Sequence, residues 1–537
     1  MTDHDLTSTL LPAQQPSDRA DVILRIQDDD VDDGGATPEQ INNQNGNHHD
    51  PRLCFTNPYG FIGSNGFSVP ETTTVDPFRN NTPCVDGIYE WVKIVVCIPI
   101  ALARLVLFGL CLLIGYIATK TALHGWKDKE NPMPKWRCRL MGVTRLCGRC
   151  ILFSFGYHWI TRKGKPAPRE IAPIVVSNHV SYIEPIFYFY ELFPTMVAAE
   201  SHDSIPFVGT IIRAMQVIYV DRFSPTSKKH AISEIKRKAS CNRFPRVLLF
   251  PEGTTTNGRA LISFQLGAFL PGYSIQPVVV RYPHVHFDQS WGLVSLPKLM
   301  IRMFMQFHNY MEVEYLPIIS PRYNGKESSS DFAKRTSRAM ATALNVVQTP
   351  HSYGDLMLLT KAAQANQERP SDYMIGMSQM EQVSSLEAVD FLDKFLSMDP
   401  DSSGRATYDG FVRALRLKAC AVAEDIFSFI DIEKMGTITY KQYLYGSLHV
   451  MKLQGFQRSC ELIYTECSNE GDKISEQKLE ELIRPATPDL NAEEAHELLK
   501  LFDTNGDGKI SKNDLCGCLK RNPLLIALFS RCLLPSL

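Results

Sequence analysis

An apolar stretch near the start of the chain constrains the fold more than any other feature. It runs from Ile94 to Ala118, "IVVCIPIALARLVLFGLCLLIGYIA", and is long enough to cross a bilayer as a helix. Its fifteen Leu, Ile, Val and Phe residues favour insertion by about 4.5 to 9 kcal/mol, whereas Arg104 near its centre opposes it by about 2.5 to 3.5 kcal/mol. We therefore expect residues 89–123 to hold the chain in a membrane.

The sequence leaves open how this segment lies in the membrane. Pro99 and Arg104 suit either a single span or a bent hairpin that enters and leaves on one face. Lys and Arg are frequent after the segment and scarce before it, so the positive-inside rule places the downstream chain in the cytosol. Residues 124–165 mix basic and apolar side chains, which suits either a helix in the head-group plane or a helix packed on the next domain.

Composition limits what the rest of the chain can be. Its 537 residues allow two or three domains, and its net charge of -2 gives no overall field for a nucleic acid partner. Residues 1–88 are rich in Asp, Asn and Gly and are expected to form a disordered arm, in which Asn80 begins a glycosylation sequon that matters only if the arm faces a lumen. Cys147 and Cys150 form a CxxC pair without a second pair, so structural or acylated thiols are expected here, not a zinc site.

Residues 166–345 alternate short apolar runs with helical stretches, which is typical of an α/β domain. Runs rich in Val and Ile predict strands within residues 172–178, 195–201, 216–222, 246–253 and 274–282. Polar residues stand where these runs end: His179, Arg222 and Glu252. Because ligands collect at the carboxyl ends of strands in open α/β sheets, we expect the functional site there.

His179 and Glu184 form a candidate catalytic pair. On one regular helix, residues five apart point in directions about 140° apart, so the two can meet only if a turn separates a strand from a helix. A carboxylate bonded to one imidazole nitrogen fixes the tautomer and raises the basicity of the other nitrogen, which can then take a proton from a hydroxyl. The alternative is a histidine satisfied by backbone groups and a glutamate that caps a helix.

The stretch from Gly253 to Gly258 has the spacing of a P-loop without its chemistry. Arg259 stands where the essential Lys belongs, and Ala260 stands where Ser or Thr would bind magnesium. The sequence also lacks a Gly-x-Ser-x-Gly elbow and a His-Glu-x-x-His motif. Nucleotide hydrolases, serine hydrolases of the elbow type and zincins are therefore excluded.

Four sequence blocks, in this order, resemble the motifs of the glycerolipid acyltransferase superfamily: "NHVSYIEP", "GTIIRAMQVIYVDR", "FPEGTTTNGR" and "IQPVVV". The resemblance implies a mixed-sheet α/β domain that moves an acyl group from acyl-CoA to a lysophospholipid without a catalytic metal. It implies that His179 is the general base and that Glu184 stands where the family usually has Asp. The added methylene can be absorbed by a shifted helix start, so an active site is expected.

By the same resemblance, five residues would bind the substrates: Arg222, Glu252, Gly253, Thr254 and Pro277. Arg222 would hold the acceptor phosphate, the next three residues would line the acceptor site, and Pro277 would shape the acyl or acceptor pocket. Two departures put the head-group preference in doubt: Gln216 replaces a frequent Gly, and Thr255 stands where a second basic residue is frequent.

An all-α domain with EF-hands is predicted for residues 386–520, after a polar linker at 346–385 and before a tail at 521–537. The stretch "DTNGDGKISKND" fits the calcium loop at each scored position except the last. Its predicted ligands are Asp503, Asn505, Asp507, Lys509 through its carbonyl, and Asp514 in place of the usual Glu. A weaker loop holds Asp399, Asp401 and Ser403 without a closing carboxylate, and with relics at 431–442 and 467–478 it predicts four EF-hand-like units in two pairs.

Together, the blocks and the EF-hands resemble the EF-hand-bearing branch of the lysophospholipid acyltransferases, nearest to the plant lysophosphatidylethanolamine acyltransferases. This implies lysophosphatidylethanolamine as acceptor, Ca²⁺ as a structural or regulatory ion, membrane lipids as partners, and an endoplasmic reticulum, Golgi or endosomal membrane with both domains in the cytosol. A broader range that includes lysophosphatidylcholine, lysophosphatidylserine and lysophosphatidate stays open. So do two other classes: a catalytically dead, membrane-tethered calcium sensor, and a protein that binds lysolipid without acylating it.

Overall fold

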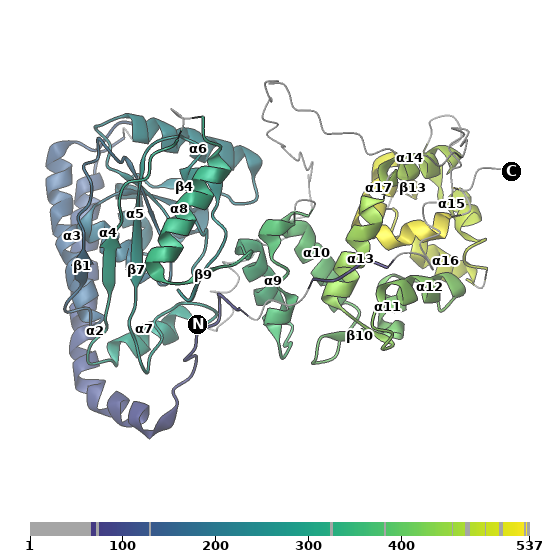
Figure 1. The fold of residues 1–537 in the computed structure, drawn as a ribbon, viewed down its shortest axis with the longest axis horizontal. Helices are drawn as coiled ribbons and strands as arrows, with labels where there is room; N and C mark the ends of the chain where they lie inside the picture. The colour runs from purple at the N-terminus through teal and green to yellow at the C-terminus, as the bar shows by residue number, and fades with distance from the viewer. Residues whose placement is uncertain are drawn as a thin grey trace, which may run out of the picture. The chain divides into compact units, whose positions relative to one another are not determined.

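The computed structural model describes residues 66–70, 75–127, 130–322, 326–380, 383–453, 455–467, 473–488, 490–503, 508–530 and 533. These residues form two compact units (Figure 1), the first made chiefly of residues 72–364 and 370–386 and the second chiefly of residues 387–537. In the described part of the chain, one helix is long and apolar enough to cross a membrane, α2 (Gly87–Leu123).

A seven-stranded sheet forms the centre of the first unit, with the strand order β1-β8-β7-β2-β5-β3-β4. Neighbouring strands are parallel except β7 and β8, so the sheet is mixed as expected. The five predicted strands are confirmed and lie side by side: β2 (Ile174–Ser177), β3 (Thr195–Ala199), β4 (Ile218–Val220), β5 (Val247–Leu249) and β7 (Ile275–Arg281). The two strands at the other edge were not predicted: β1 (Thr161–Lys163) and β8 (Glu312–Tyr315).

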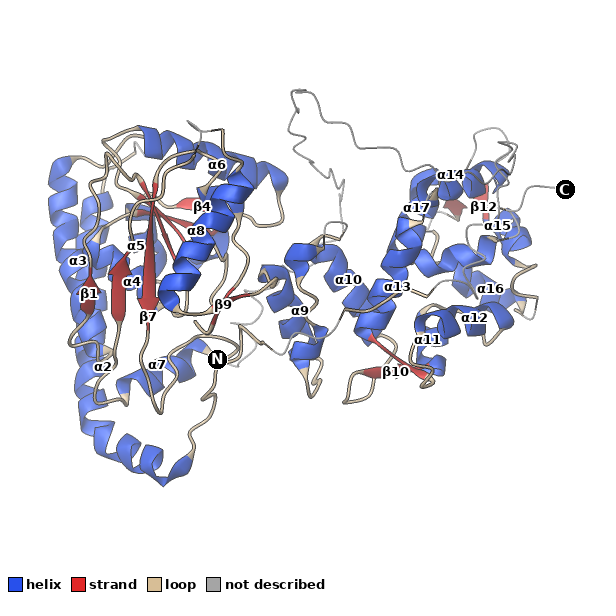
Figure 2. Ribbon diagram, viewed as in Figure 1, coloured by secondary structure: helices blue, strands red, loops and turns tan. Residues whose placement is uncertain are grey.

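Helices cover both faces of this sheet (Figure 2). On one face, Val175 of β2 belongs to a core that includes residues of α3 (Lys135–Ser154), α4 (Ile183–Glu191) and α7 (Leu296–Phe304). On the other face, Ile174 and Val176 pack with residues of α6 (Pro225–Ser240) and α8 (Ser329–Leu344). Successive side chains of a strand point to opposite faces, and burial of both faces accounts for the unbroken apolar runs that predicted these strands.

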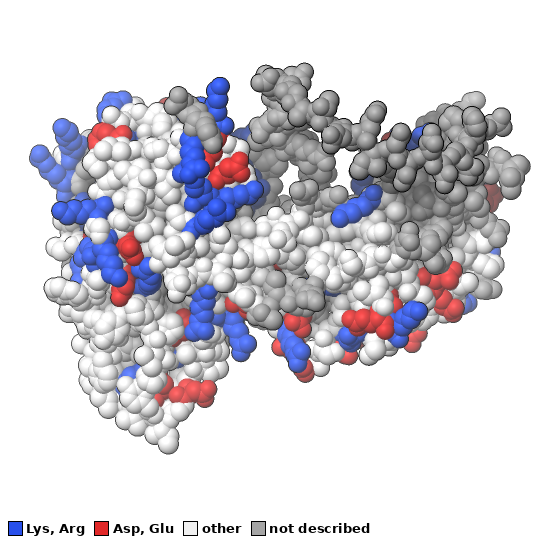
Figure 3. Space-filling view, viewed as in Figure 1, with Lys and Arg blue, Asp and Glu red and all other residues white. Residues whose placement is uncertain are grey.

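Helix α2 lies along the first unit and packs against α3, α5 (Val208–Ala214) and α7. Its buried side chains recur every three or four positions, as expected for one helix face: Cys97, Ala101, Arg104, Cys111, Ala118 and Ala122. Its other face exposes large apolar side chains: Val95, Leu102, Val106, Leu113 and Ile117. In Figure 3, the lower part of this unit, where α2 lies, shows few charged side chains.

The charge that opposes insertion, Arg104, is satisfied inside the protein. Its guanidinium donates hydrogen bonds to the backbone carbonyls of Phe304, Gln306 and Phe307, and Nη2 lies 3.1 Å from His158 Nε2. These carbonyls stand at and just after the end of α7, where helix carbonyls lack intrahelical partners. The free-energy cost of placing the Arg104 charge in lipid therefore does not apply in this arrangement.

The basic segment 124–165 contains α3, which packs on α2 and α4. Three of its arginines donate hydrogen bonds to backbone carbonyls of the first unit: Arg137, Arg145 and Arg149. For these side chains the structure matches the packed alternative. The same helix exposes apolar side chains, Val143, Leu146 and Phe153, next to the apolar face of α2.

Two short parts of the amino-terminal arm are ordered, contrary to the prediction of disorder for residues 1–88. Phe78 is fully buried against side chains of α9 (Tyr353–Gln364), and Asn80 Nδ2 donates to the carbonyl of Ser290 over 2.7 Å. Phe67 lies with its ring centroid 5.2 Å from that of Phe429 in the second unit. The sequon asparagine, Asn80, is thus buried and hydrogen-bonded; residues 1–65 and 71–74 lie outside the described part.

The predicted linker and tail are partly folded as well. Within residues 346–385, strand β9 (Val347–Gln348) pairs with β6 (Ala260–Leu261), and Leu356 and Leu359 of α9 are buried in the first unit. Within the predicted tail, the 3₁₀-helix η6 (Pro523–Phe529) is buried throughout and packs against α12, α13, α15 and α17. Both corrections have one cause, which is that these segments carry apolar side chains that fill a core.

In its described residues, the second unit has the helices of four helix–loop–helix pieces in two pairs, as predicted. The helices are α10 (Ser385–Leu396), α11 (Tyr408–Ala414), α12 (Ala421–Ile430), α13 (Tyr440–Lys452), α14 (Phe456–Cys467), α15 (Glu476–Ile483), α16 (Ala492–Leu499) and α17 (Lys512–Arg521). Short antiparallel strands join the loops of each pair: β10 (Arg405–Thr407) with β11 (Thr437–Thr439), and β12 (Ile474–Ser475) with β13 (Lys509–Ile510).

Candidate active site

The carboxyl ends of three parallel strands place three predicted site residues at one edge of the sheet. His179 follows β2, Glu252 follows β5, and Arg222 follows β4. In the sheet, β2, β5, β3 and β4 are consecutive parallel neighbours. The structure therefore brings His179 and Glu252 together and places Arg222 two strands from Glu252 along the same edge.

His179 and Glu184 meet across the turn between β2 and α4. Imidazole Nδ1 lies 3.1 Å from Glu184 Oε2, and the backbone N–H groups of Val180 and Ser181 donate to Glu184 Oε1 over 3.2 and 3.1 Å. Glu184 is completely buried. Because a carboxylate only accepts hydrogen bonds, Nδ1 carries the proton and Nε2 keeps its lone pair, which is the tautomer that a general base needs.

Aromatic packing holds the imidazole ring of His179 in one orientation. The ring stacks on Phe250, with centroids 4.1 Å apart and planes at 20°. The side chain of His179 keeps 17% of its surface exposed, compared with 0% for the side chain of Glu184. A buried carboxylate and a fixed, partly exposed imidazole are the arrangement that a general base needs.

Glu252 lies beneath His179. The sequence predicts that Glu252 lines the acceptor site, and the structure instead buries it. It is fully buried, and its Oε1 accepts the backbone N–H of His179 over 2.9 Å. Burial raises the pKa of the Glu252 carboxyl to about 8, and the charge of Glu184 adds to the effect. The sequence could not show this, because the position of Glu252 depends on β5 lying next to β2.

The loop after Glu252 also holds His179, through the backbone carbonyl of His179. The N–H of Thr256 donates to the carbonyl of His179 over 2.8 Å. Gly253 begins the loop in the left-handed region, with φ of +74°, which glycine adopts without strain, and Thr254 is buried. This loop therefore fixes the backbone of the base, and among the predicted acceptor residues Gly253 and Thr254 stand within it.

Arg222 presents a guanidinium group at the same edge of the sheet. The group stacks on the ring of Tyr353, 4.4 Å from its centroid, and the side chain is half-buried. Stacking on a ring leaves the in-plane N–H donors of a guanidinium available to an anion. Within the described residues no carboxylate forms an ion pair with Arg222, so the geometry suits the phosphate that the resemblance assigns to it.

Pro277 does not reach this edge, contrary to the expectation that it shapes a substrate pocket. It lies within β7 opposite Val176, is buried, and accepts the N–H of Leu316 over 2.9 Å through its carbonyl. Its place in the interior of a strand makes it part of the sheet, because the register puts it level with the middle of β2.

Sequence reasoning missed His202 at the catalytic edge. It lies in the 3₁₀-helix η1 (Glu200–Ser204), directly after β3, and its Nδ1 lies 3.1 Å from the carbonyl oxygen of Ala199. Burial lowers the pKa of His202, and the charge of Arg222 lowers it further. The strand-end rule that selected Arg222 would have selected His202 too, since it follows the predicted strand at 195–201.

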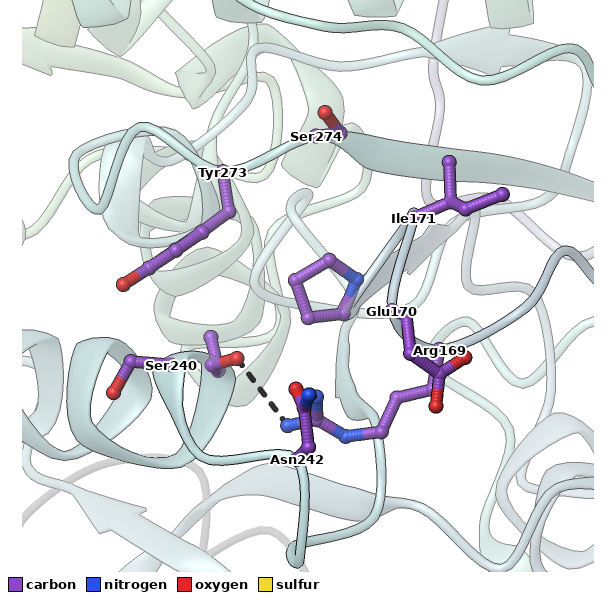
Figure 4. Close-up of a pocket in the computed structure, with 9 residues that line it drawn as sticks. Arg169, Glu170, Ile171, Ser240, Asn242, Tyr273 and Ser274 are labelled. Carbon is purple, nitrogen blue, oxygen red and sulfur yellow. Dashed lines mark hydrogen bonds between the residues drawn. The ribbon is translucent and has the colours of Figure 1, made fainter.

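A shallow cavity in the first unit lies at the opposite end of the strands. Pro173 and Ser274, which precede β2 and β7, are among its lining residues (Figure 4). Its arginine, Arg169, donates to the carbonyls of Ala239 and Cys241 over 3.2 and 2.9 Å, the first of these being the dashed line in the figure. The guanidinium of Arg169 caps the carboxyl end of α6 and is occupied by these carbonyls. The cavity therefore does not resemble the site at His179.

In the described residues of the fourth EF-hand loop, backbone hydrogen bonds hold the carboxylates of the first and last loop residues. The N–H of Gly508 donates to Asp503 Oδ2 over 2.8 Å, and the N–H of Ser511 donates to Asp514 Oδ2 over 3.0 Å. Lys509 lies in β13, and Asn505 and Asp507 lie outside the described residues. Carboxylate and carbonyl oxygens are the ligands that Ca²⁺ takes, so this donor set fits the ion.

In the described parts of the first two loops, side-chain oxygens accept hydrogen bonds from within the same loop. Asp401 Oδ1 accepts hydrogen bonds from Ser403 Oγ and from the N–H of Arg405, over 2.7 and 2.9 Å, and Asp399 adopts a positive φ of 57°. In the loop at 431–442, Gln442 Oε1 accepts the N–H of Thr439 over 2.7 Å and closes a capping box. This matches the prediction that these loops are weaker than the fourth.

Comparison with known proteins agrees with this geometry. Residues 160–281 match the domain family described as Acyltransferase, and residues 470–522 match the EF-hand domain pair. Lysophospholipid acyltransferase LPEAT2 of Arabidopsis thaliana is 60% identical over 548 aligned residues, which cover 100% of both chains. A lysophosphatidylcholine acyltransferase of Drosophila melanogaster is 31% identical over 71% of this chain and 73% of its own.

A solved structure is also similar in part. The crystal structure of the 1-acyl-sn-glycerophosphate acyltransferase PlsC from Thermotoga maritima aligns with a TM-score of 0.35 and 16% identity, over 47% of this chain and 96% of that chain. That similarity is too low to add to the fold described above.

Proposed function

This chain belongs to the lysophospholipid acyltransferase family, and we propose that it moves a fatty acyl group from acyl-CoA to the free hydroxyl of lysophosphatidylethanolamine at a membrane surface. The observation that carries the proposal is the bond between His179 Nδ1 and Glu184 Oε2, 3.1 Å long, which leaves Nε2 as a base. The half-buried guanidinium of Arg222 at the same edge of the sheet supports a phosphate-bearing acceptor.

The chemistry is a direct transfer. His179 Nε2 takes the proton of the glycerol hydroxyl, and the hydroxyl oxygen attacks the carbonyl carbon of the thioester. The carbon–sulfur bond then breaks, and the thiolate of coenzyme A takes the proton back from the imidazolium of His179. A general base contributes about 10²- to 10⁴-fold to such a reaction, and holding both substrates at one membrane surface contributes the rest through proximity.

The buried residues around His179 hold it in position. Glu252 accepts the backbone N–H of His179, and Thr256 donates to its carbonyl. Phe250 limits the rotation of the ring. Each of these contacts reduces the freedom of the base, which matters because catalysis depends on sub-ångström placement of the proton acceptor.

We propose that α2 and α3 lie in the cytosolic side of an endoplasmic reticulum, Golgi or endosomal membrane and do not form a separate span. One face of α2 packs on the first unit, its other face is apolar, and Arg104 is bonded to carbonyls of that unit. A helix packed in this way supports the hairpin alternative over a span surrounded by lipid. An acceptor dissolved in the bilayer then enters the site from the side of α2.

Two finer points belong to the same proposal. The EF-hand pair supports calcium binding, and we propose that Ca²⁺ modulates the acyl transfer. Lysophosphatidylethanolamine is the proposed acceptor because of the resemblance of the whole chain, and a broader range of acceptors remains the competing candidate because Thr255 replaces a basic residue.

Release of coenzyme A tests the proposal. Membranes that carry the protein would be supplied with oleoyl-CoA and a panel of lysophospholipids, for wild type and His179→Ala side by side. Release by wild type that is lost in the variant, and fastest with lysophosphatidylethanolamine, is the expected result. Absence of release with every acceptor would instead favour a calcium sensor or a lysolipid-binding protein with a dead site.

A further inference from the structure

His202 lies at the catalytic edge of the sheet and has no part in the chemistry described above. It follows β3, and β3 lies between β5, which leads to Glu252, and β4, which leads to Arg222. All of these strands are parallel, and neighbouring strands lie about 4.8 Å apart. His202 is therefore placed between the proposed base, which follows β2 two strands away, and the proposed phosphate-binding arginine, which follows the neighbouring strand β4.

The tautomer of His202 is fixed by the backbone. Its Nδ1 lies 3.1 Å from the carbonyl oxygen of Ala199, and because a carbonyl only accepts, Nδ1 carries the proton. Nε2 then holds a lone pair, and within the part of the chain that the structure describes it has no hydrogen-bond partner. Burial and the nearby charge of Arg222 lower the pKa of the ring, which favours the neutral form that can accept at Nε2.

The short helix that carries His202 is held rigidly. Asp203 Oδ1 accepts the hydroxyl of Tyr219 over 2.6 Å and forms an ion pair with Arg213 over 3.1 Å. Gly209 of α5 packs so closely on this turn that an added Cβ would lie 2.1 Å from the Asp203 carbonyl oxygen. A neutral acceptor on a rigid turn beside a cationic site is pre-organised to receive a hydrogen bond, which costs little ordering entropy on binding.

We propose that His202 selects the head group of the acceptor, by accepting a hydrogen bond at Nε2 from a primary ammonium while Arg222 holds the phosphate. Ethanolamine joins its ammonium to the phosphate through two carbon atoms, so the two groups can reach side chains on adjacent strands. The trimethylammonium of choline has no N–H to donate. The inference rests on the proposed function, because it names a residue for the acceptor of that reaction.

The test compares two acceptors in one preparation. Release of coenzyme A from oleoyl-CoA is measured with lysophosphatidylethanolamine and lysophosphatidylcholine, and the ratio of the two kcat/KM values is taken for wild type, His202→Ala and His202→Asn. Loss of a hydrogen bond to a charged group is worth roughly a tenfold change, so His202→Ala should lower the ratio about that much. The Asn variant keeps an acceptor oxygen and should preserve part of it. His230→Ala, an exposed histidine on α6, is the matched control.

The outcomes separate the inference from the function on which it rests. A lower ratio in His202→Ala with an unchanged rate on lysophosphatidylcholine supports the assignment, and the unchanged rate shows that the variant is folded. Equal losses on both acceptors, or an unchanged ratio, overturn the assignment while the proposed function stands. No release by wild type with either acceptor overturns the proposed function and the assignment with it.

Discussion

The imidazole Nδ1 of His179 lies 3.1 Å from Glu184 Oε2, and the two side chains belong to different elements, the end of β2 and the start of α4. The turn between the strand and the helix brings together two residues that one helix would hold apart. Because Glu184 also accepts the N–H groups of Val180 and Ser181, its position is fixed before a substrate binds. The pair therefore has the fixed position and tautomer that the proposed general base requires.

Replacing Glu184 should show how much the orientation of His179 contributes to catalysis. In Glu184→Gln the amide can turn its N–H₂ group toward Nδ1, which favours the wrong tautomer, so kcat for coenzyme A release should fall roughly 10²- to 10⁴-fold. Glu184→Asp keeps the carboxylate on a shorter arm and should lose much less. The measurement is kcat with oleoyl-CoA and a saturating lysophospholipid.

The pattern of the two variants decides the role of the carboxylate. Equal, small losses in both would mean that Glu184 only caps α4, which is the alternative that the sequence left open. Circular dichroism of the purified variants controls for unfolding, since Glu184 is buried and its replacement can loosen the turn.

The Glu252 carboxyl should make stability depend on pH. Burial raises its pKa from 4.5 to about 8, so between these values the unfolded chain has released this proton and the folded chain still holds it. The unfolding free energy that this group contributes is therefore complete below pH 4.5 and is lost as the pH rises toward 8. Glu252→Gln, which is neutral at every pH, should remove that part of the dependence.

The comparison is between melting temperatures of wild type and Glu252→Gln at several pH values from 5 to 8. The variant should gain stability relative to wild type as the pH rises. A constant difference across this range would show that the carboxyl is ionised in the folded protein. Glu252→Ala serves as the contrast, because it also removes the acceptor of the His179 N–H and should cost about 1 to 3 kcal/mol at any pH.

Much of the catalytic unit follows from local sequence pattern. The strands β2, β5 and β7 are apolar runs rich in Val, Ile and Leu that are almost wholly buried. His179 and Glu252 stand where two such runs end, and Arg222 stands after the partly buried β4. Strands β1 and β8 could not be found in this way, since "TRK" at 161–163 and "EVEY" at 312–315 carry charges and lack an apolar run. The first is a strand because it pairs with β8, and the second, which is β8 itself, because it also pairs with β7.

Roles that depend on distant contacts were beyond the sequence. Arg104 donates hydrogen bonds to carbonyls two hundred residues further along the chain. Because the sequence does not show these partners, the free-energy cost of inserting Arg104 could be calculated only as if its side chain faced lipid. Glu252 becomes a support for His179 only because β5 lies beside β2. The sequence predicts a tail where the buried η6 lies, because this apolar run is too short to identify as a core element without its neighbours.

The contacts of Arg104 predict that α2 contributes to the stability of the first unit. Arg104→Leu removes the donor for the carbonyls of Phe304, Gln306 and Phe307 and should lower the unfolding free energy by about 1 to 3 kcal/mol. Val106→Ala, on the exposed face of the same helix, should have little effect. The measurement is thermal unfolding of the protein in one detergent, and equal shifts for the two variants would mean that α2 is not docked as described.

Calcium binding should depend on the fourth EF-hand loop. Asp503 is the first residue of that loop and Asp514 the last, and their carboxylates are placed by hydrogen bonds from Gly508 and Ser511. Asp503→Ala should therefore abolish calcium binding, because the first ligand contributes a full charge to the ion. Asp401→Ala should change binding little, since the carboxylate of Asp401 already accepts hydrogen bonds from Ser403 and Arg405 and its loop lacks a closing carboxylate.

Calorimetric titration of the full chain with Ca²⁺ measures this directly, with wild type and the two variants in the same buffer. Persistence of the binding heat in Asp503→Ala would assign the ion to another loop. Coenzyme A release in calcium and in chelator then connects binding to the reaction: if Ca²⁺ modulates the transferase through this loop, the rate of wild type responds to calcium and that of Asp503→Ala does not. Equal wild-type rates in both conditions would leave the fourth loop a structural site, because binding without a change in rate stabilises only the second unit.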